Sequence, residues 1–124
     1  MERRTRQRAA IQEALSSAKR PLTPAEVLDA AKVTVPNLGL ATVYRALRAL
    51  IEDGGAHLVE IPGSPPRYET AHLGHHHHFH CRNCRQVFEV DGCPGNLARL
   101  APPGFVLDGH EVVLYGRCTR CAAA

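Results

Sequence analysis

The spacing of the apolar residues predicts a helix near the start of the chain. Ile11, Ala14, Leu15 and Ala18 recur at intervals of three and four residues. This spacing places them on one face of a helix that runs from about Thr5 to Ala18. The polar residues between them would face solvent, so we expect an amphipathic helix that packs on a neighbouring element.

A capping motif predicts a second helix. The residues Thr23-Pro24-Ala25-Glu26 form a capping box, with proline at the first helical position. Val27, Leu28 and Ala31 continue an apolar face behind it. We therefore expect a second short helix that buries these three side chains.

The third predicted helix, Ala41–Ile51, has an apolar face and a polar face. Val43, Leu47, Leu50 and Ile51 form the apolar stripe. The polar face carries one aromatic and two basic side chains, Tyr44, Arg45 and Arg48. Arginine can bind guanine edges or phosphates, and tyrosine can contact phosphates or thymine methyl groups. Taken alone, the helix is more simply explained as an amphipathic helix with a solvated polar face.

The hydrophobic period then changes to that of strands. Residues 57–61 and 67–70 alternate as strands do, and the Pro/Gly/Ser segment 62–66 between them has turn composition. Three short helices followed by a β-hairpin make a winged helix, a variant of the helix-turn-helix. This context shifts the interpretation of the third helix toward DNA recognition.

The second half of the chain predicts a separate small domain. Residues 86–90 and 111–115 have strand composition, and a short helix is expected around 96–100. The predicted fold class is α+β: a winged-helix DNA-binding domain in residues 1–71, followed by a small α/β metal-binding and dimerisation domain in residues 72–124.

The composition indicates a small cytoplasmic protein with a thin hydrophobic core. The chain has 124 residues, 44% hydrophobic and 22% charged, with three Phe, three Tyr and no Trp. Its apolar stretches are shorter than the ~20 residues of a membrane helix, and its N-terminus has no signal-peptide pattern. The net charge of +3 is unevenly distributed, because four arginines lie in the first eight residues: Arg3, Arg4, Arg6 and Arg8. Such a basic segment suggests contact with phosphates.

Four of the five cysteines form two Cys-x-x-Cys pairs separated by 33 residues: Cys81 with Cys84, and Cys118 with Cys121. In a reducing compartment this spacing indicates a closed tetrahedral zinc site rather than disulfides. The competing interpretation is a rubredoxin-like iron centre for electron transfer. That centre usually has glycine after each second cysteine, where this chain has Arg85 and Ala122, so we favour structural zinc.

The sequence His75-His76-His77-His78 offers further metal ligands. It lies inside the chain, between a predicted strand and the first cysteine pair, which argues against a purification tag. On a strand, alternation would direct His76 and His78 to one side and His75 and His77 to the other. One segment could therefore supply two metal sites, and imidazole suits zinc, iron, nickel and copper.

The chain resembles the ferric-uptake-regulator family of metal-dependent transcriptional repressors over nearly its whole length. The resemblance rests on Thr5-Arg-Gln-Arg8, Gly39-Leu-Ala-Thr-Val-Tyr-Arg45, Arg67-Tyr-Glu69, His75–His78, the Cys81/Cys84 pair, and Leu114-Tyr-Gly-Arg-Cys118 leading to Cys121. It implies a winged-helix DNA-binding domain, a dimerisation domain with a four-cysteine zinc site, and a regulatory metal at the hinge. The candidate DNA-binding residues are therefore Arg8, Thr42, Tyr44, Arg45 and Arg48.

By the same resemblance the regulatory metal ligands would be Glu69, His76 and His78, with Glu89 at a further acidic position. The histidine that iron regulators carry at the second helix is replaced here by Pro21. His57 is a possible substitute for it, and a solvated histidine is the equal alternative. Peroxide sensing is disfavoured, because that branch needs the same missing histidine and an aspartate where Thr70 stands.

A second site of the family would match three histidines of this chain, His75, His77 and His110. Its usual glutamate falls at about Asn96, which is a weak ligand. Cys93 lies nearby in the sequence and is either a soft replacement ligand or a lone buried thiol, of which we favour the lone thiol.

The resemblance implies a homodimer that binds a palindromic operator when metal is bound. Zinc is the favoured regulatory metal because of the histidine run and the missing second-helix ligand. Iron or manganese is the alternative because Glu69 is retained, and nickel is the least favoured. The metal response should fade below about pH 6, where imidazoles become protonated. No enzyme is expected, because the deaminase signature of His-x-Glu before Pro-Cys-x-x-Cys is absent.

Overall fold

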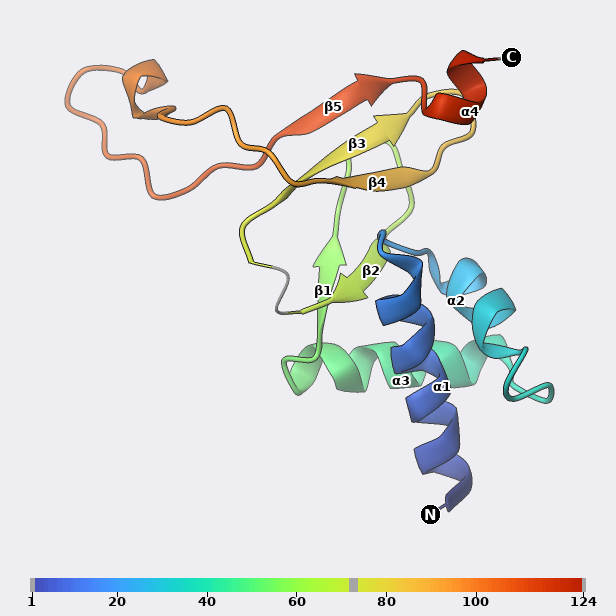
Figure 1. The fold of residues 1–124 in the computed structure, drawn as a ribbon. Coiled ribbons are helices and arrows are strands. Elements are labelled where there is room, and N and C mark those ends of the chain that lie inside the picture. The colour runs from blue at the N-terminus through green and yellow to red at the C-terminus, as the bar shows by residue number, and fades with distance from the viewer. Residues whose placement is uncertain (1, 72–73, 124) are drawn as a thin grey trace. The chain divides into compact units, whose positions relative to one another are not determined.

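The computed structural model describes residues 2–71 and 74–123, and the chain divides into two compact units, Met1–Gly74 and His75–Ala124. Figure 1 shows the elements of each unit. The predicted division after residue 71 falls beside residues 72 and 73, which lie outside the described part of the chain. Among the described residues, no helix is long and apolar enough to span a membrane.

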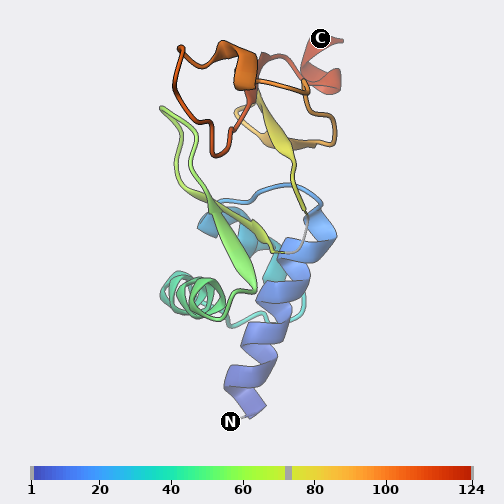
Figure 2. The same cartoon turned by 90° about the vertical axis from the view of Figure 1, so that its left-hand side faces the viewer.

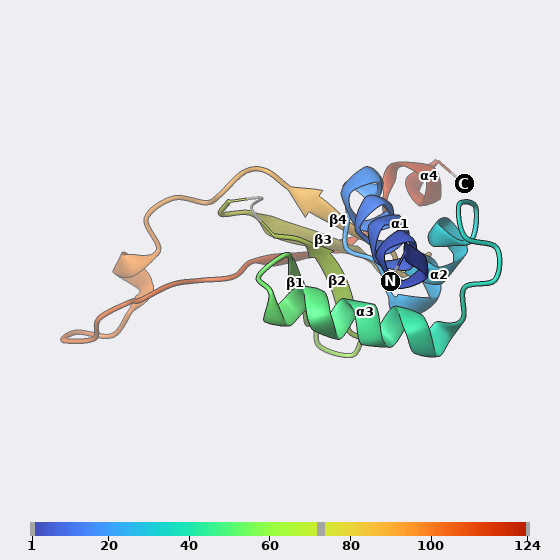
Figure 3. The same ribbon diagram turned by 90° about the horizontal axis from the view of Figure 1, so that it is seen from below.

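The first unit contains three helices and a hairpin, the arrangement of a winged helix. The elements are α1 (Glu2–Ala18), α2 (Pro24–Ala31), α3 (Leu40–Glu52), β1 (Ala56–Val59) and β2 (Arg67–Thr70). Figure 1 shows α1 crossing α3, and Figure 3 shows α1 nearly end-on beside α3, with the β1–β2 hairpin following α3. The basic residues at the N-terminus are helical, so α1 begins before the predicted start at Thr5.

The buried faces of the three helices follow the predicted hydrophobic spacing. Ile11 and Leu15 of α1 pack in one cluster with Val27 of α2 and Leu47 of α3. The prediction for Ile51 is wrong, because its side chain is 36% exposed at the end of α3. A helix has 3.6 residues per turn, and Leu50 already occupies the inward position of that last turn.

The predicted capping box begins α2. The Thr23 side chain accepts a hydrogen bond from the backbone N–H of Glu26 at 3.2 Å, and the Glu26 carboxylate accepts one from the backbone N–H of Thr23 at 2.9 Å. These two bonds satisfy N–H groups that have no partner within the helix. The helix therefore starts at Pro24.

The hairpin is tied to the segment between the first two helices. Leu22 and Tyr68 exchange two backbone hydrogen bonds, of 2.9 and 2.8 Å. Within the hairpin, β1 and β2 pair antiparallel, and His57 stands opposite Glu69. Residues directly opposite each other project from the same face of a sheet. The hairpin therefore holds these two candidate ligands side by side.

The second unit is a three-stranded sheet with little helix. It contains β3 (His77–Cys81), β4 (Val87–Val90), β5 (Val113–Gly116) and α4 (Thr119–Ala122), in the strand order β4-β3-β5. The strands β3 and β4 pair antiparallel, whereas β3 and β5 pair parallel. The helix predicted around residues 96–100 is only a single 3₁₀ turn, Ala98–Leu100.

The segment that connects β4 to β5 extends away from the sheet in Figure 1 and faces the viewer in Figure 2. Apart from its 3₁₀ turn it has no regular structure. It leaves large apolar side chains in solvent: Leu100, Phe105 and Val106 are between 70% and 86% exposed. A contiguous exposed apolar segment of this kind is typical of a surface that binds a partner.

Candidate DNA-binding surface and metal centres

The outer face of α3 carries the side chains that were predicted to read DNA. Tyr44, Arg45 and Arg48 are exposed, and Tyr44 has a relative exposure of 52%. The Arg45 guanidinium donates a hydrogen bond to the Thr42 hydroxyl at 3.0 Å. This bond orients the guanidinium along the helix surface, where Arg side chains can meet base edges or phosphates.

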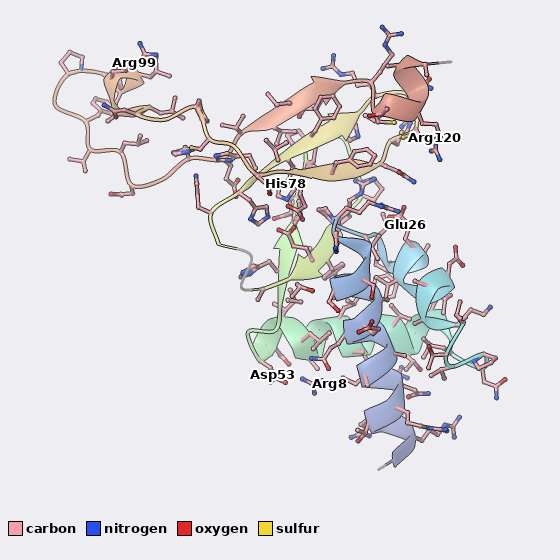
Figure 4. The ribbon with its side chains drawn as sticks, viewed as in Figure 1. Arg8, Glu26, Asp53, His78, Arg99 and Arg120 are labelled. Atoms are coloured by element: carbon pink, nitrogen blue, oxygen red, sulfur yellow. The ribbon has the colours of Figure 1, made fainter. Side chains whose placement is uncertain are left out.

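A concave surface between α1 and α3 concentrates positive charge. It is lined by Arg3, Arg4 and Arg8 of α1 and by Arg45 of α3. Arg8 also forms an ion pair with Asp53, just beyond the end of α3 (Figure 4). Asp53 was not among the predicted site residues, because an isolated acid after a helix has no distinctive spacing. The ion pair fixes one arginine, and the other three remain available to an anion.

The four predicted zinc ligands come together at one end of the β4-β3-β5 sheet. The ligand atoms of Cys81, Cys84, Cys118 and Cys121 lie within 4.8 Å of one another. The Cys84 and Cys118 sulfurs are 3.8 Å apart. A tetrahedral ion with Zn–S bonds of ~2.3 Å needs sulfurs about 3.8 Å apart. The cluster therefore fits zinc.

Hydrogen bonds from the backbone favour the thiolate form at this cluster. The N–H groups of Cys84 and Cys118 donate to the Cys81 sulfur, and they lower the pKa of that thiol to about 6. The pKa of Cys118 is also lowered, chiefly by the backbone N–H of Cys121. A low pKa makes the thiol a ready metal ligand near neutral pH.

Cys121 shows the opposite shift. The side chain of Asn83 lowers its pKa, but burial and the neighbouring sulfurs outweigh that effect and raise the pKa to about 11. Thiolates this close together repel one another, and a divalent cation removes the repulsion. Sequence reasoning missed Asn83, because the two residues inside a Cys-x-x-Cys pair have no required identity.

A second cluster joins β3 to β4. The Glu89 carboxylate lies 3.1 Å from His76 Nε2 and 3.8 Å from His78 Nε2. His78 and Glu89 are also register partners on neighbouring strands. Figure 4 labels His78 beside the sheet. Two imidazoles and a carboxylate form a partial ligand set for a divalent transition metal.

A third cluster uses the alternate histidines of the same segment. It brings together His75, His77, Cys93 and His110, whose ligand atoms lie within 4.8 Å of one another. The preference for a lone buried thiol at Cys93 is wrong, because this side chain is exposed and lies between two imidazoles. Sequence spacing could not reveal this, because Cys93 and His110 approach only through the long β4–β5 connection.

His77 is the buried member of the third cluster, with 2% of its surface exposed. Burial lowers its pKa, and the proximity of His75 and His110 lowers it further. A neutral ring is the form that binds metal. Its Nδ1 accepts a hydrogen bond from the backbone N–H of Val112 at 3.0 Å, and among the described residues its Nε2 has no partner.

A family model matches almost the whole chain. The ferric uptake regulator family matches over residues 2–115. This chain belongs to the ferric uptake regulator family. It is therefore a metal-responsive transcriptional regulator, in agreement with the resemblance drawn from its motifs.

Individual relatives within the family support the same assignment. The transcriptional regulator FurA of Mycobacterium tuberculosis is 32% identical over 121 residues, covering 95% of this chain and 82% of FurA. The solved ferric uptake regulator of Helicobacter pylori, described as having three functional metal-binding sites, is 25% identical with a TM-score of 0.76, covering 94% and 79% of the two chains. FurB, a zinc uptake regulator from M. tuberculosis, is 30% identical with a TM-score of 0.54, covering 96% and 95%.

These relatives are transcriptional regulators, which fits the expectation that the chain is not an enzyme. They include proteins named for iron and for zinc, so membership of the family leaves the sensed metal open. Family members bind DNA and metals, and the described residues offer surfaces for both.

The two candidate ligands in the first unit lie on its hairpin. Glu69 is 4% exposed in β2, and His57 is exposed in β1 opposite it. Pro21, which replaces a histidine of the iron regulators, is fully buried. Proline has no side-chain ligand atom, so the predicted candidates from the described residues of this unit stay Glu69 and His57 of the hairpin.

Proposed function

We propose that this regulator is a metal-dependent repressor that binds a palindromic operator as a homodimer. The observation that carries the proposal is the cluster of His76, His78 and Glu89 at the beginning of the second unit. It supplies two imidazoles and a carboxylate close to the point where the chain passes between the units. A metal bound there can respond to the position of the first unit.

The proposed regulatory site is completed by Glu69, with His57 as the other candidate. His76 lies seven positions after Glu69 along the chain, and seven extended residues span at most about 25 Å. The connection is therefore too short to hold the hairpin carboxylate far from the cluster, and ligation by Glu69 is part of the proposal. A carboxylate from one unit and imidazoles from the other would make metal binding depend on how the units are arranged.

Metal would act by linkage. An ion that gains Glu69 as a ligand in one arrangement binds that arrangement more tightly, and so raises its population. The preferred arrangement would hold two recognition helices about 34 Å apart in a dimer, which matches one turn of B-DNA. The protein without regulatory metal would bind the operator weakly.

Because its proposed partner is DNA and its thiols must stay reduced, we place the protein in the cytoplasm.

The proposed DNA interface is the outer face of α3 together with the arginines of α1. Tyr44, Arg45 and Arg48 would enter the major groove, and Arg3 and Arg4 would contact the phosphates beside it. The exposed apolar segment around Phe105 is the candidate dimer contact. A second copy would bury side chains that a monomer leaves in water.

Zinc is the metal we favour for the regulatory site. His76 and His78 supply nitrogen ligands, and zinc accepts mixed nitrogen and carboxylate sites with four ligands. Iron or manganese is the alternative, because Glu69 and Glu89 supply two oxygen ligands. The four-cysteine cluster would hold a separate structural zinc in either case.

The test is a titration of Zn(II), Fe(II), Mn(II) and Ni(II) against a library of A/T-rich palindromes, with the zinc of the four-cysteine site retained. One metal should strengthen operator binding by at least tenfold in the wild type and not in His76→Ala. The matched control is His80→Ala, which removes a β3 histidine that lies in none of the three clusters. If operator binding had the same strength with every metal and without metal, the proposed metal switch would be refuted.

A second variant separates the DNA surface from the metal site. Arg45→Ala should weaken operator binding by roughly 1–3 kcal/mol while leaving metal affinity unchanged. Arg99→Ala is the charge-matched control, because Arg99 lies in the β4–β5 connection rather than on α3 (Figure 4). If the two variants weakened binding equally, only net charge would matter and α3 would not be the recognition helix.

A further inference from the structure

The position of Cys93 has a chemical consequence outside the proposed switch. Its sulfur lies 3.5 Å from His75 Nε2 and 3.2 Å from His110 Nε2. These three side chains come from before β3, from just after β4 and from just before β5. The two strand connections therefore bring a thiol and two imidazoles to one point.

The distances match those between ligands of one tetrahedral ion. With a Zn–S bond of ~2.3 Å and a Zn–N bond of ~2.0 Å, neighbouring sulfur and nitrogen ligands stand about 3.5 Å apart. The two separations from the Cys93 sulfur agree with this value within a few tenths of an ångström.

The rings of the three histidines also converge. The His75 ring centroid lies 4.6 Å from that of His77 and 4.9 Å from that of His110, and the His77 and His110 centroids are 5.1 Å apart. The ligand atoms of these three rings and of Cys93 lie within 4.8 Å of one another. Neutral imidazole is the ligating form.

Asn96 falls at about the position of the glutamate that is usual at the family's second site, and its side chain has another role. The side-chain oxygen of Asn96 accepts a hydrogen bond from the backbone N–H of Ala98 at 3.0 Å. Asn96 therefore holds the start of the 3₁₀ turn and does not supply an oxygen ligand. The thiol of Cys93 is the remaining candidate for a fourth, anionic ligand.

His77 contributes differently from the other two histidines. Its Nδ1 accepts a bond from Val112, so the ring proton of the neutral form lies on Nε2, which is buried and without a partner among the described residues. A buried donor without a hydrogen-bond partner is unfavourable. Binding a metal through Nε2 would move the ring proton to Nδ1, which breaks the Val112 bond and replaces the unsatisfied Nε2–H by a metal bond. His77 therefore joins the site last.

We propose that Cys93 takes the place of the glutamate that is usual at the family's second site. As a thiolate ligand with His75, His110 and then His77, it would form a three-imidazole, one-thiolate site for zinc or a similar borderline-soft ion. Thiolate favours zinc over manganese, which prefers oxygen ligands. Cys93 would thus set the metal selectivity of this site. The site is separate from the four-cysteine cluster and from the proposed regulatory ligands, and its chemistry does not depend on operator binding.

Cobalt(II) reports the proposed sulfur ligand directly, because a cobalt–thiolate bond gives a charge-transfer absorption in the near ultraviolet that histidine and carboxylate ligands do not. Full-length protein with zinc retained at the four-cysteine site and with the double change His76→Ala and His78→Ala would be titrated with Co(II). We expect one equivalent to bind with a charge-transfer band. Adding Cys93→Ser should abolish the band, whereas Asp91→Asn, an exposed change nearby, should leave it intact.

The histidine variants test whether His110 contributes more to metal binding than His77, which is expected to join the site last. His110→Ala should weaken cobalt binding by more than the roughly 10–100-fold loss typical of a group outside the ligand set. His77→Ala should weaken it less, because His77 must first give up its bond to Val112. Zinc should displace the cobalt, and millimolar manganese should not. Cobalt binding without a sulfur band, or an unchanged band in Cys93→Ser, would overturn the proposal.

Alkylation gives an independent readout. Cys93 is exposed, so N-ethylmaleimide should modify it readily in protein stripped of loosely bound metal, as measured by the mass of its peptide. One equivalent of zinc should slow that reaction at least tenfold, but not in His110→Ala. Equal rates with and without zinc would refute a zinc–Cys93 bond. Neither readout uses DNA, so the proposed repressor function and this site can fail separately.

Discussion

The first unit buries fifteen hydrophobic residues, from Ala10 to Ala71, whereas the described part of the second unit buries only Cys81 and Val87. The second unit instead gathers cysteines, histidines and one glutamate into clusters. Burial of apolar area stabilises a domain by roughly 25 cal/mol per Å². A unit of about fifty residues with so little buried apolar area needs other stabilisation, and metal ligation or a second copy can supply it.

Under the proposed function, this contrast divides the chain into a DNA-binding unit that is stable without metal and a metal-binding unit whose stability depends on its ligands. The helices that present Tyr44 and Arg45 rest on a core that does not require an ion. The sheet that carries the ligands has few apolar contacts of its own, so ligand binding should change its stability strongly. The proposed regulatory ligands His76, His78 and Glu89 thus lie in the unit with the smaller apolar core.

The sharpest test of the contrast removes the structural zinc. The double change Cys118→Ser and Cys121→Ser should unfold the second unit, because a structural zinc site contributes on the order of 10 kcal/mol to folding. The first unit should keep its helices. Hydrogen exchange resolved by peptide would measure both units in one experiment, with Cys93→Ser as the control. Loss of protection throughout residues 2–71 would show that the units are not independent.

The converse test weakens the hydrophobic core. Leu47→Ala should lower the free energy of unfolding of the first unit by ~2–5 kcal/mol, because it leaves a cavity at a fully buried position. Zinc affinity at the four-cysteine site should not change. Leu58→Ala is the control, since that side chain is 46% exposed and its loss should cost less than about 0.5 kcal/mol. A parallel loss of zinc affinity would contradict the proposed division of labour.

A smaller effect is expected at the start of α2. Thr23→Ala removes the capping hydrogen bond to Glu26 and should destabilise the first unit by about 1 kcal/mol. Chemical denaturation followed by helix content would measure this. Thr34→Ala changes an exposed threonine outside the helices and should have no comparable effect. Equal losses in the two variants would mean that the capping box contributes little.

The smallest expected effect is a pH dependence of the second unit. Burial lowers the pKa of folded His77, and His75 and His110 add to this shift, so below its ordinary value of about 6.5 the unfolded chain binds more protons than the folded one. Stability is therefore present above about pH 6.5 and is lost as the pH falls. Melting midpoints of protein holding only its structural zinc should decline less steeply between pH 7 and 5 in His77→Gln. An identical decline would exclude His77 as the cause.

Much of the first unit could be predicted because its signals are local. The spacing of Ile11 and Leu15, and the capping box at Thr23, each act within a few residues. The error at Ile51 arose at a helix end, where a small change in phase exposes a side chain. In the second unit, alternation correctly separated His76 and His78 from His75, although regular strand begins only at His77.

The sequence by itself determined which residues could bind metal and where α2 begins, because cysteine spacing and the capping box depend on neighbours along the chain. Only the tertiary structure decided that β5 pairs parallel with β3, that Asp53 holds Arg8, and that Cys93 meets His110. Each of these contacts joins residues separated by at least seventeen positions, and its formation depends on how the intervening chain folds. No local pattern encodes that path.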